Sequence, residues 1–283
     1  MENRVMKMAL FFLLTLIVSG TSIKAQEYSA MTFNIRYSTP NDGENWWELR
    51  KEWVANVVNF YEPDVMGIQE GLHTQVQFLD SALVNYEYVG VGRDDAKEEG
   101  EYAAIFYRSN ELEVLDNGTF WLSETPDIPS FGWGANFRRI ATWAKFKLKK
   151  TEKEFWVFNA HLDHETPLAR LNAVRLIVEK AEDWNQQKLP VIVMGDLNAP
   201  PESPPIKYLS SKMYDSKLES KAVSIGPLGT YNGFDVNHPL DNRIDYIFVD
   251  KSISVQKYAV ISETRDQKTP SDHLPVFIKF LLK

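Results

Sequence analysis

The chain has 283 residues, of which 44% are hydrophobic and 13% aromatic, which is enough for one large core and at most two domains. It contains no cysteine, which excludes disulfide bonds, thiolate metal sites and lipidation at cysteine. The formal net charge of −8 argues against tight, non-specific binding to long nucleic acid, because an acidic surface repels a polyanion; a local basic patch is still compatible with this charge.

The N-terminal 25 residues have the pattern of a signal peptide. Arg4 and Lys7 precede an apolar run over residues 8–18, which is short for a bilayer-spanning helix, and small residues follow up to Ala25. We therefore expect export to the periplasm or the outside of the cell, with no stable membrane insertion after cleavage. The alternative is an uncleaved helix that holds the protein to the membrane. Cleavage after Ala25 removes three basic residues and one acidic residue, which changes the net charge from −8 to −10.

The remaining residues, 26–283, show no long linker, fixed-period repeat or low-complexity run, and we predict a single domain. Hydrophobic periodicity predicts helices at residues 46–61, 75–83 and 166–184. Strands are predicted at residues 28–35, 65–68, 86–91, 103–107, 113–121, 141–148, 155–159, 189–194, 244–249, 255–261 and 274–280. Helices separate some of these strands and hairpins separate others, which predicts an α/β sandwich and not a purely parallel doubly wound sheet.

Polar residues recur at or just past the ends of the predicted strands. They are Asn34, Glu70, His161, Asp196, Asn198, Asp245, Asp272 and His273. One such residue means little, because Asp and Asn are common in turns. Eight of them, including two of only five histidines, indicate a site at one edge of the sheets, where α/β proteins place ligands.

The segment Gly195-Asp196-Leu197-Asn198 follows an apolar strand. The glycine allows the backbone to turn, and residues two apart in an extended segment point the same way. Asp196 and Asn198 are therefore candidates to hold a water or a metal ion and to steady a phosphoryl oxygen. The alternative is an Asx turn that caps the following residues.

Two further segments combine carboxylates with strand ends. His273 has Asp272 beside it, and Asp245 lies where the polar loop before residues 244–249 ends. A carboxylate paired with imidazole fixes the tautomer and favours the charged ring, as acid–base chemistry requires. Glu70 follows an apolar strand with nothing basic beside it, which favours an oxygen-ligated hard cation such as Mg²⁺, Mn²⁺ or Ca²⁺. The alternatives are a structural histidine and an exposed loop glutamate.

The motifs FNIR, GIQE, NAHLD, GDLN, RIDYIF and SDHLPV resemble, in order, the signature of the endonuclease/exonuclease/phosphatase superfamily, over residues 31–281. The resemblance is to a bacterial, secreted branch of a superfamily that includes pancreatic-type deoxyribonucleases, apurinic endonucleases, sphingomyelinases, deadenylases and sugar-phosphate phosphatases. It implies a deoxyribonuclease-I-like fold, in which two packed mixed β-sheets are flanked by helices in four layers. It also implies a metal-dependent phosphoric ester hydrolase with its site at one edge of the sandwich.

The resemblance implies a role for each residue. The implied cation ligands are Glu70, Asn34 and Asp272. The implied catalytic residues are His161, Asp196, Asn198, Asp245, His273 and Glu101. Asp245 would orient His273, while the proton acceptor for the attacking water would be either Asp196 or His273. Glu101 in EYAAIFYR corresponds to a glutamate that supports the first catalytic histidine, here His161.

Two arginines correspond to phosphate-binding positions of the superfamily. They are Arg139 in RRIATW and Arg36 in FNIR. The alternative for both is a surface arginine, and for Glu101 a strand-edge glutamate.

The substrate depends on loops and not on superfamily membership. Residues 41–47 and 128–137 combine aromatic residues with Gly and Asn and are candidates for a wall that stacks on a sugar or base; the alternative places Trp46 and Trp47 in the core. We expect a small or flexible phosphoester, such as a sugar phosphate, nucleotide or short oligonucleotide. A secreted non-specific nuclease and a non-catalytic binding module are the alternatives, and no protein partner is inferred.

Overall fold

The computed structural model describes residues 26–283, and the predicted signal peptide at residues 1–25 lies outside them. The described chain forms two six-stranded mixed sheets. In the first sheet the order is β11-β12-β1-β2-β4-β3, with β1 (Tyr28–Asn34), β2 (Val65–Gln69), β3 (Tyr86–Val89), β4 (Ile105–Arg108), β11 (Ile253–Val260) and β12 (Val276–Leu282). In the second the order is β5-β6-β7-β8-β10-β9, with β5 (Leu112–Trp121), β6 (Ile140–Leu148), β7 (Glu154–His161), β8 (Val191–Asp196), β9 (Tyr214–Asp215) and β10 (Asp245–Val249).

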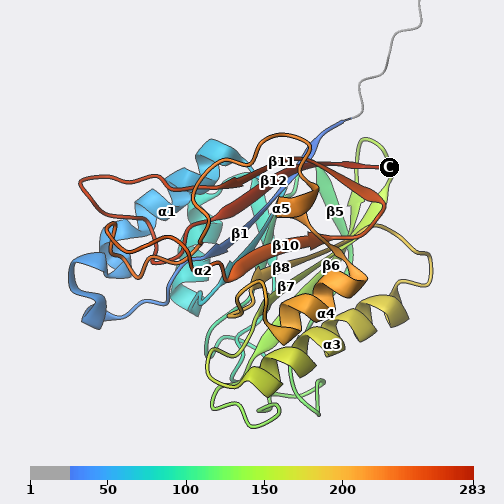
Figure 1. Ribbon diagram of the computed structural model, residues 1–283, viewed down its shortest axis with the longest axis horizontal. Helices are drawn as coiled ribbons and strands as arrows, with labels where there is room; N and C mark the ends of the chain where they lie inside the picture. Colours follow the sequence, from blue (N-terminus) through green and yellow to red (C-terminus); the bar gives the residue numbers. More distant parts are fainter. Residues whose placement is uncertain (1–25) are drawn as a thin grey trace, which may run out of the picture.

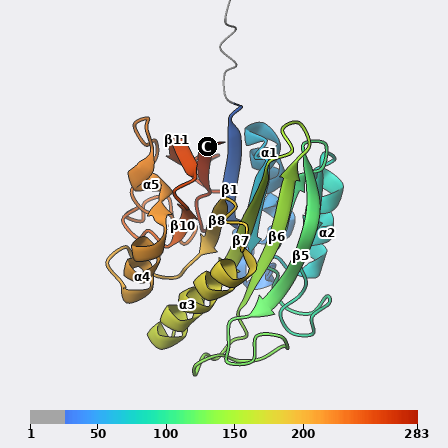
Figure 2. The same cartoon turned by 90° about the vertical axis from the view of Figure 1, so that its right-hand side faces the viewer.

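The sheets pack face to face, and helices cover their outer faces (Figure 1). Side chains such as Phe146, Phe155 and Phe280 fill the space between the sheets, where they bury a large apolar area. Helices α1 (Trp47–Tyr61) and α2 (His73–Ala82) cover the first sheet, whereas α3 (Pro167–Trp184) and α4 (Pro204–Lys212) cover the second. Figure 2 shows β5, β6, β7 and β8 side by side with α3 crossing near them. The predicted four-layer α/β sandwich is confirmed.

Most predicted elements are present, with ends that differ by a few residues. The sequence did not predict the 3₁₀ helix η1 (Pro40–Asn45), α4, the short strand β9 or α5 (Ser216–Glu219). Helix α4 was missed because paired prolines flank its start, although proline is well tolerated in the first turn of a helix. Within the described residues, no helix is both long and apolar enough to cross a membrane.

Strand pairing places the polar ends of several strands at one edge. β7 and β8 are parallel and put His161 opposite Asp196, and the antiparallel pairing of β8 with β10 puts Asp245 opposite the same Asp196. In the other sheet, β1 and β2 are parallel, so Asn34 and the residue before Glu70 end at the same level. These two sets of polar strand ends, one from each sheet, meet where the sheets pack together.

A buried polar bridge joins the sheets just behind that edge. Asn159 on β7 donates to the carbonyls of Ile68 (2.8 Å) and Ala104 (2.9 Å) and accepts from Nε2 of Gln69 at 2.6 Å. Gly67 leaves room for this amide, since a Cβ at Gly67 would lie 2.5 Å from Cγ of Asn159. The amide of Asn159 is hydrogen-bonded through both its nitrogen and its oxygen, so it links β2 to β7 at a defined position.

Candidate active site

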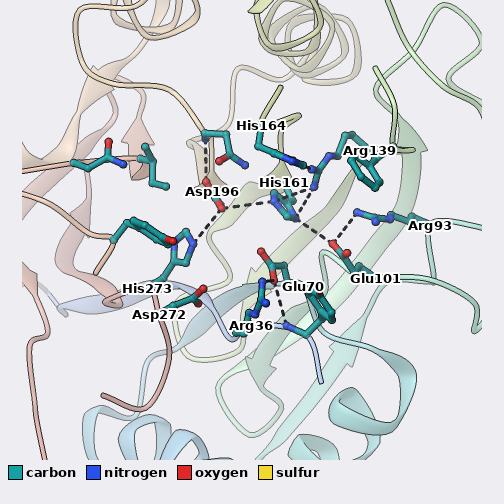
Figure 3. A pocket seen from close by; sticks show the side chains of 16 residues that line it. Arg36, Glu70, Arg93, Glu101, Arg139, His161, His164, Asp196, Asp272 and His273 are labelled. Carbon is teal, nitrogen blue, oxygen red and sulfur yellow. Dashed lines mark hydrogen bonds and ion pairs between the residues drawn. The ribbon is translucent and has the colours of Figure 1, made fainter. Parts of the chain in front are cut away.

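A cavity of about 500 Å³ opens at the edge where the polar strand ends meet. Nine of the predicted site residues line it: Arg36, Glu70, Glu101, Arg139, His161, Asp196, Asn198, Asp272 and His273. The other two, Asn34 and Asp245, are buried behind the lining and contact its carboxylate and imidazole groups. The structure thus brings lining residues from seven separate sequence motifs to one place (Figure 3).

The backbone turns sharply where these residues leave their strands. Arg36, Glu70 and Asn198 have φ angles of 56°, 61° and 46°, in the left-handed region that side chains with a Cβ adopt at some cost in free energy. Gly195, with φ of 143°, approaches the carbonyl of Ala160 so closely that a Cβ would collide with it. These turns point the side chains into the cavity.

His273 and Asp245 form a buried pair. Nδ1 of His273 lies 2.9 Å from Oδ2 of Asp245, and Nε2 lies 3.8 Å from Oδ2 of Asp196. Burial by itself would lower the pKa of His273, but the negative charges of Asp245 and Asp196 outweigh it and raise this pKa well above its ordinary value. The ring is therefore charged at neutral pH and donates a hydrogen bond to Asp245 through Nδ1.

Asp196 lies at the centre of the site and is 1% exposed. Its Oδ1 accepts from the backbone N–H of Asn198 at 2.9 Å, and its Oδ2 accepts from Nδ2 of Asn34 at 3.0 Å. Burial raises the pKa of Asp196, and the charge of Asp245 raises it further. A carboxylate with a raised pKa is a better proton acceptor than an exposed one.

His161 is in the opposite ionisation state from His273. Nη1 of Arg139 lies 2.9 Å from Nε2 and 3.0 Å from Nδ1 of the ring. Burial and the positive charge of Arg139 lower the pKa of His161 to about 3, so the ring is neutral. Arg139 is 5% exposed and also lies 3.7 Å from Asp163, and burial lowers its own pKa.

The expected partnership of Glu101 with His161 is present only at a longer distance. Oε2 of Glu101 lies 3.5 Å from Nδ1 of His161 but 2.7 Å from Nη1 of Arg93, so its closest ionic partner is an arginine that the sequence did not single out. Figure 3 shows the resulting row of groups, in which His273, Asp196, His161, Glu101 and Arg93 follow one another across the cavity.

The donor set around Glu70 fits a hard divalent cation. Ligand atoms of Glu70, His161 and Asp196 lie within 4.8 Å of one another, and so do those of Asp196, Asp245 and His273. Asp272 lines the same cavity and is 7% exposed; burial raises its pKa, the charged His273 lowers it, and the charge of Glu70 raises it again. Closely spaced buried carboxylates repel one another unless a cation lies among them.

Asn34, one of the expected cation ligands, contacts two carboxylates of the site. Its Nδ2 donates to Oε1 of Glu70 at 3.0 Å and to Asp196, while its Oδ1 accepts from the backbone N–H of Arg36 at 3.0 Å. In this orientation Asn34 links the two carboxylates, and its Oδ1 lies at the Arg36 backbone. Among the described His, Asp and Glu side chains, the imidazole of His161 is grouped with Glu70 and Asp196.

The two loops that are rich in aromatic residues, 41–47 and 128–137, differ in whether they contribute to the cavity. Trp47 is buried in the core at 2% exposed, and Trp46 donates Nε1 to Oγ of Ser38, so neither lines the cavity. Phe137, from the second loop, does line it, is 39% exposed, and lies with its ring centroid 5.3 Å from that of His164. One loop therefore fits the core alternative and the other supplies an aromatic wall.

Several lining residues were not singled out from the sequence. They are Tyr37, Arg93, His164, Tyr231, Asn242 and Ile244. Tyr37, His164, Asn242 and Ile244 lie in or beside the recognised motifs and could have been found by extending them. Arg93 and Tyr231 lie in separate loops and carry no local signal, although the ring of Tyr231 packs edge-on against His273 at 5.1 Å.

The chain is similar to known proteins over nearly its whole described length. A sequence model of the endonuclease/exonuclease/phosphatase family matches residues 31–273. The crystal structure of a family protein from Bacteroides thetaiotaomicron is 36% identical with a TM-score of 0.88, covering 92% of this chain and 99% of that chain. A mannosyl-6-phosphatase from Bacteroides thetaiotaomicron VPI-5482 is 36% identical with a TM-score of 0.85, covering 90% of this chain and all (100%) of that chain.

A curated relative matches over a smaller part of its length. An uncharacterised protein of Acanthamoeba polyphaga mimivirus is 31% identical over 166 residues, which are 54% of this chain and 59% of that protein, so the match spans less than two thirds of that relative. The family model, the fold and the whole-length structural similarity agree. The chain belongs to the endonuclease/exonuclease/phosphatase family of phosphoester hydrolases.

Proposed function

We propose that the protein is a divalent-cation-dependent phosphatase that hydrolyses a small phosphate monoester, such as a sugar phosphate. The observation that carries this proposal is the cavity of about 500 Å³, which holds a carboxylate cluster and a buried arginine–histidine pair side by side. The carboxylates suit a cation and the arginine suits a phosphoryl group, and a small ester requires both within a few ångströms. The volume lies within the range of roughly 300–1,000 Å³ of small-molecule sites.

The residues of the cavity divide the chemistry between them. A divalent cation held by Glu70 and Asp272 would neutralise phosphoryl oxygens that otherwise repel a nucleophile. Arg139 donates to the phosphoryl group, and the neutral His161 keeps its ring against that guanidinium. Asn198 lines the cavity beside Asp196, and Arg36 lies 3.8 Å from Glu70.

The directions of the pKa shifts of Asp196 and His273 support one division of roles between these two candidate bases. His273 is already protonated because Asp245 and Asp196 raise its pKa, so it acts as a hydrogen-bond and proton donor and not as the base. Asp196, whose pKa burial raises, takes the proton of the attacking water. Asp245 orients the ring of His273 and stabilises its charge.

The charge of the chain, the lining of the cavity and the similarity to a known phosphatase favour a small substrate. The chain carries a formal charge of −8, which opposes the many phosphate contacts that duplex binding relies on. One structural neighbour that is 36% identical over its whole length is a mannosyl-6-phosphatase, which favours a phosphorylated sugar over a polynucleotide. Exposed Phe137 offers an apolar surface to the sugar ring.

The test is a substrate panel assayed with Mg²⁺ or Mn²⁺ and again with excess EDTA. The panel contains hexose 6-phosphates, nucleoside monophosphates, a bis-aryl phosphate diester, a short oligonucleotide and plasmid DNA, with His273→Ala as the control for contaminating activity. We expect release of inorganic phosphate from hexose 6-phosphates, loss with EDTA and little dependence on salt. Efficient plasmid nicking with a steep loss of activity as salt rises would instead support a secreted nuclease. Undiminished turnover in EDTA would overturn the cation role.

A further inference from the structure

Arg50 on α1 is a buried arginine whose hydrogen bonds all go to backbone carbonyls. It is 4% exposed. Its Nε donates to Asn45 O at 2.8 Å, its Nη1 to Ile35 O at 2.6 Å and Pro270 O at 3.0 Å, and its Nη2 to Arg36 O at 2.8 Å. A single guanidinium therefore joins two neighbouring turns to a segment that lies 220 residues away along the chain.

Two of these segments carry site residues. Ile35 and Arg36 follow Asn34 at the end of β1, where the backbone turns through the left-handed conformation at Arg36. Pro270 lies two residues before Asp272, and Oγ of the intervening Ser271 donates to Asn34 O at 2.7 Å. Arg50 therefore spans the gap between the Asn34–Arg36 turn and the segment that carries Asp272.

The turn also holds Glu70. The carboxylate of Glu70 accepts from Nδ2 of Asn34 at 3.0 Å and from the backbone N–H of Tyr37 at 3.2 Å. Gln75 on α2 supports the turn from the other side, because its Nε2 donates to Arg36 O at 2.9 Å. A shift of this turn would therefore move Glu70 relative to Asp272.

Arg50 keeps its charge in this environment. Burial lowers the pKa of Arg50 to about 10, while the carboxylates of Asp272 and Asp42 act in the opposite direction, so the guanidinium is charged at neutral pH. The rings of Trp47 and Phe234 lie 5.2 Å and 5.3 Å from its central carbon and enclose it. Arg50 does not line the cavity and cannot touch a substrate there.

We propose that Arg50 is a positioning residue of the cation site, whose four carbonyl contacts hold Glu70 and Asp272 at the separation that cation binding requires. The inference rests on the cation site of the proposed function, but not on the identity of the substrate. A lysine cannot replace the guanidinium, because an ammonium group cannot reach three segments in one plane. Residues that orient metal ligands typically change metal affinity by about 10- to 100-fold when they are replaced.

The test measures Mn²⁺ affinity by calorimetry for the wild-type protein, Arg50→Gln, Arg50→Lys and the control Val58→Ala. Val58 is buried on the same helix and is absent from the cavity lining, so its truncation lowers stability without touching the site. We expect Mn²⁺ affinity to fall by about 10-fold or more in Arg50→Gln and by less in Arg50→Lys. Val58→Ala should keep wild-type affinity despite a lower melting temperature.

A second readout is the Mg²⁺ concentration that gives half-maximal activity. It should rise in both Arg50 variants, and excess Mg²⁺ should restore most of kcat, which a general loss of folding would not allow. The inference is overturned if folded Arg50→Lys binds Mn²⁺ with wild-type affinity. It is also overturned if Val58→Ala loses as much Mn²⁺ affinity as the Arg50 variants. If Arg50→Gln does not fold, the result for Arg50→Lys decides alone. If the wild-type protein binds no divalent cation, the proposed cation role fails and this inference fails with it. If the wild type binds Mn²⁺ and hydrolyses the ester while the Arg50 variants match it, only this inference fails.

Discussion

His273 and Asp245 form an ion pair in which Nδ1 of the imidazole lies 2.9 Å from Oδ2 of the carboxylate, with the two residues 4% and 1% exposed. The backbone N–H of Asp245 donates to Oγ1 of Thr230, which fixes the start of β10. Oδ1 of Asp245 is buried without a hydrogen-bond partner in the described part of the chain. The carboxylate therefore has the imidazole as its main partner, and the two residues are expected to act as one unit.

The first prediction concerns that unit. His273→Ala should lower kcat by about 100- to 10,000-fold, because it removes a charged donor from the site. Asp245→Asn should cost less, since the ring remains but loses its orientation and its preference for the charged form. The double variant should be scarcely slower than His273→Ala alone. Steady-state kinetics on the best ester of the panel, with circular dichroism to check folding, measure this; losses that multiply in full would contradict the pairing.

The second prediction concerns cation binding by Glu70. Glu70→Gln removes a negative charge at nearly constant shape, so Mn²⁺ affinity should fall by about 100-fold or more and activity should fall with it. Calorimetry measures the affinity. Glu202→Gln is the matched control, because Glu202 has a side chain that is 89% exposed on the outer surface and should bind Mn²⁺ as the wild type does. Equal affinity in Glu70→Gln and the control would exclude Glu70 as a ligand.

The third prediction concerns the aromatic wall. Phe137→Ala should lower kcat/KM for a hexose 6-phosphate by about tenfold, equivalent to about 1.4 kcal/mol, mainly through KM. Methyl phosphate, which has no ring to contact Phe137, should be hydrolysed at an unchanged rate. Phe131→Ala is the control, since Phe131 is 51% exposed in the same loop and does not line the cavity. An equal loss for both esters would mean that Phe137 acts on the loop and not on the sugar.

The fourth prediction concerns the bridge between the sheets. Gly67→Ala would place a Cβ 2.5 Å from Cγ of Asn159, so either the amide or β2 must move. We expect a loss of about 1–3 kcal/mol in the free energy of unfolding, measured by urea denaturation. In the double variant Gly67→Ala with Asn159→Ala, the two losses should not add, because the clash has gone. An unchanged urea midpoint for Gly67→Ala would show that the sheets are less tightly registered at this point.

The fifth prediction concerns the mature N-terminus. We propose that the chain is exported and begins near Gln26 after cleavage, because basic residues, a short apolar run and small residues precede this position in order. N-terminal sequencing of the protein from its native host measures this directly. A protein that retains Met1 and is recovered in the soluble cytoplasmic fraction would contradict export.

The local pattern of the sequence predicted much of the fold and many of the site residues. Asn34, Glu70, Asp196, Asp245 and His273 were recognisable because each directly follows or begins an apolar run, and strand ends in α/β proteins meet at one edge. The pairing of Asp245 with His273 also followed from this pattern and is present at 2.9 Å. By contrast, α4 was missed, because its prolines read locally as a turn.

Other features depend on contacts between distant segments. Arg93 is the closest ionic partner of Glu101, and Tyr231 packs against His273. Neither residue lies near a motif. Their contacts could not be predicted, because loops from separate parts of the chain meet only after the sheets have packed. The same is true of Arg50, whose partners at Ile35 and Pro270 lie 15 and 220 residues away along the chain.

The sequence by itself determined which residue types stand at the strand ends, and therefore the family and the kind of chemistry. Only the tertiary structure decided their ionisation. His161 and His273 both follow apolar strands and are both buried, but the guanidinium of Arg139 helps to lower the pKa of the first, whereas the carboxylates of Asp245 and Asp196 raise the pKa of the second. Electrostatic interactions act through space over a few ångströms. The packing of the two sheets sets those distances, so the charge of each histidine is a property of the fold.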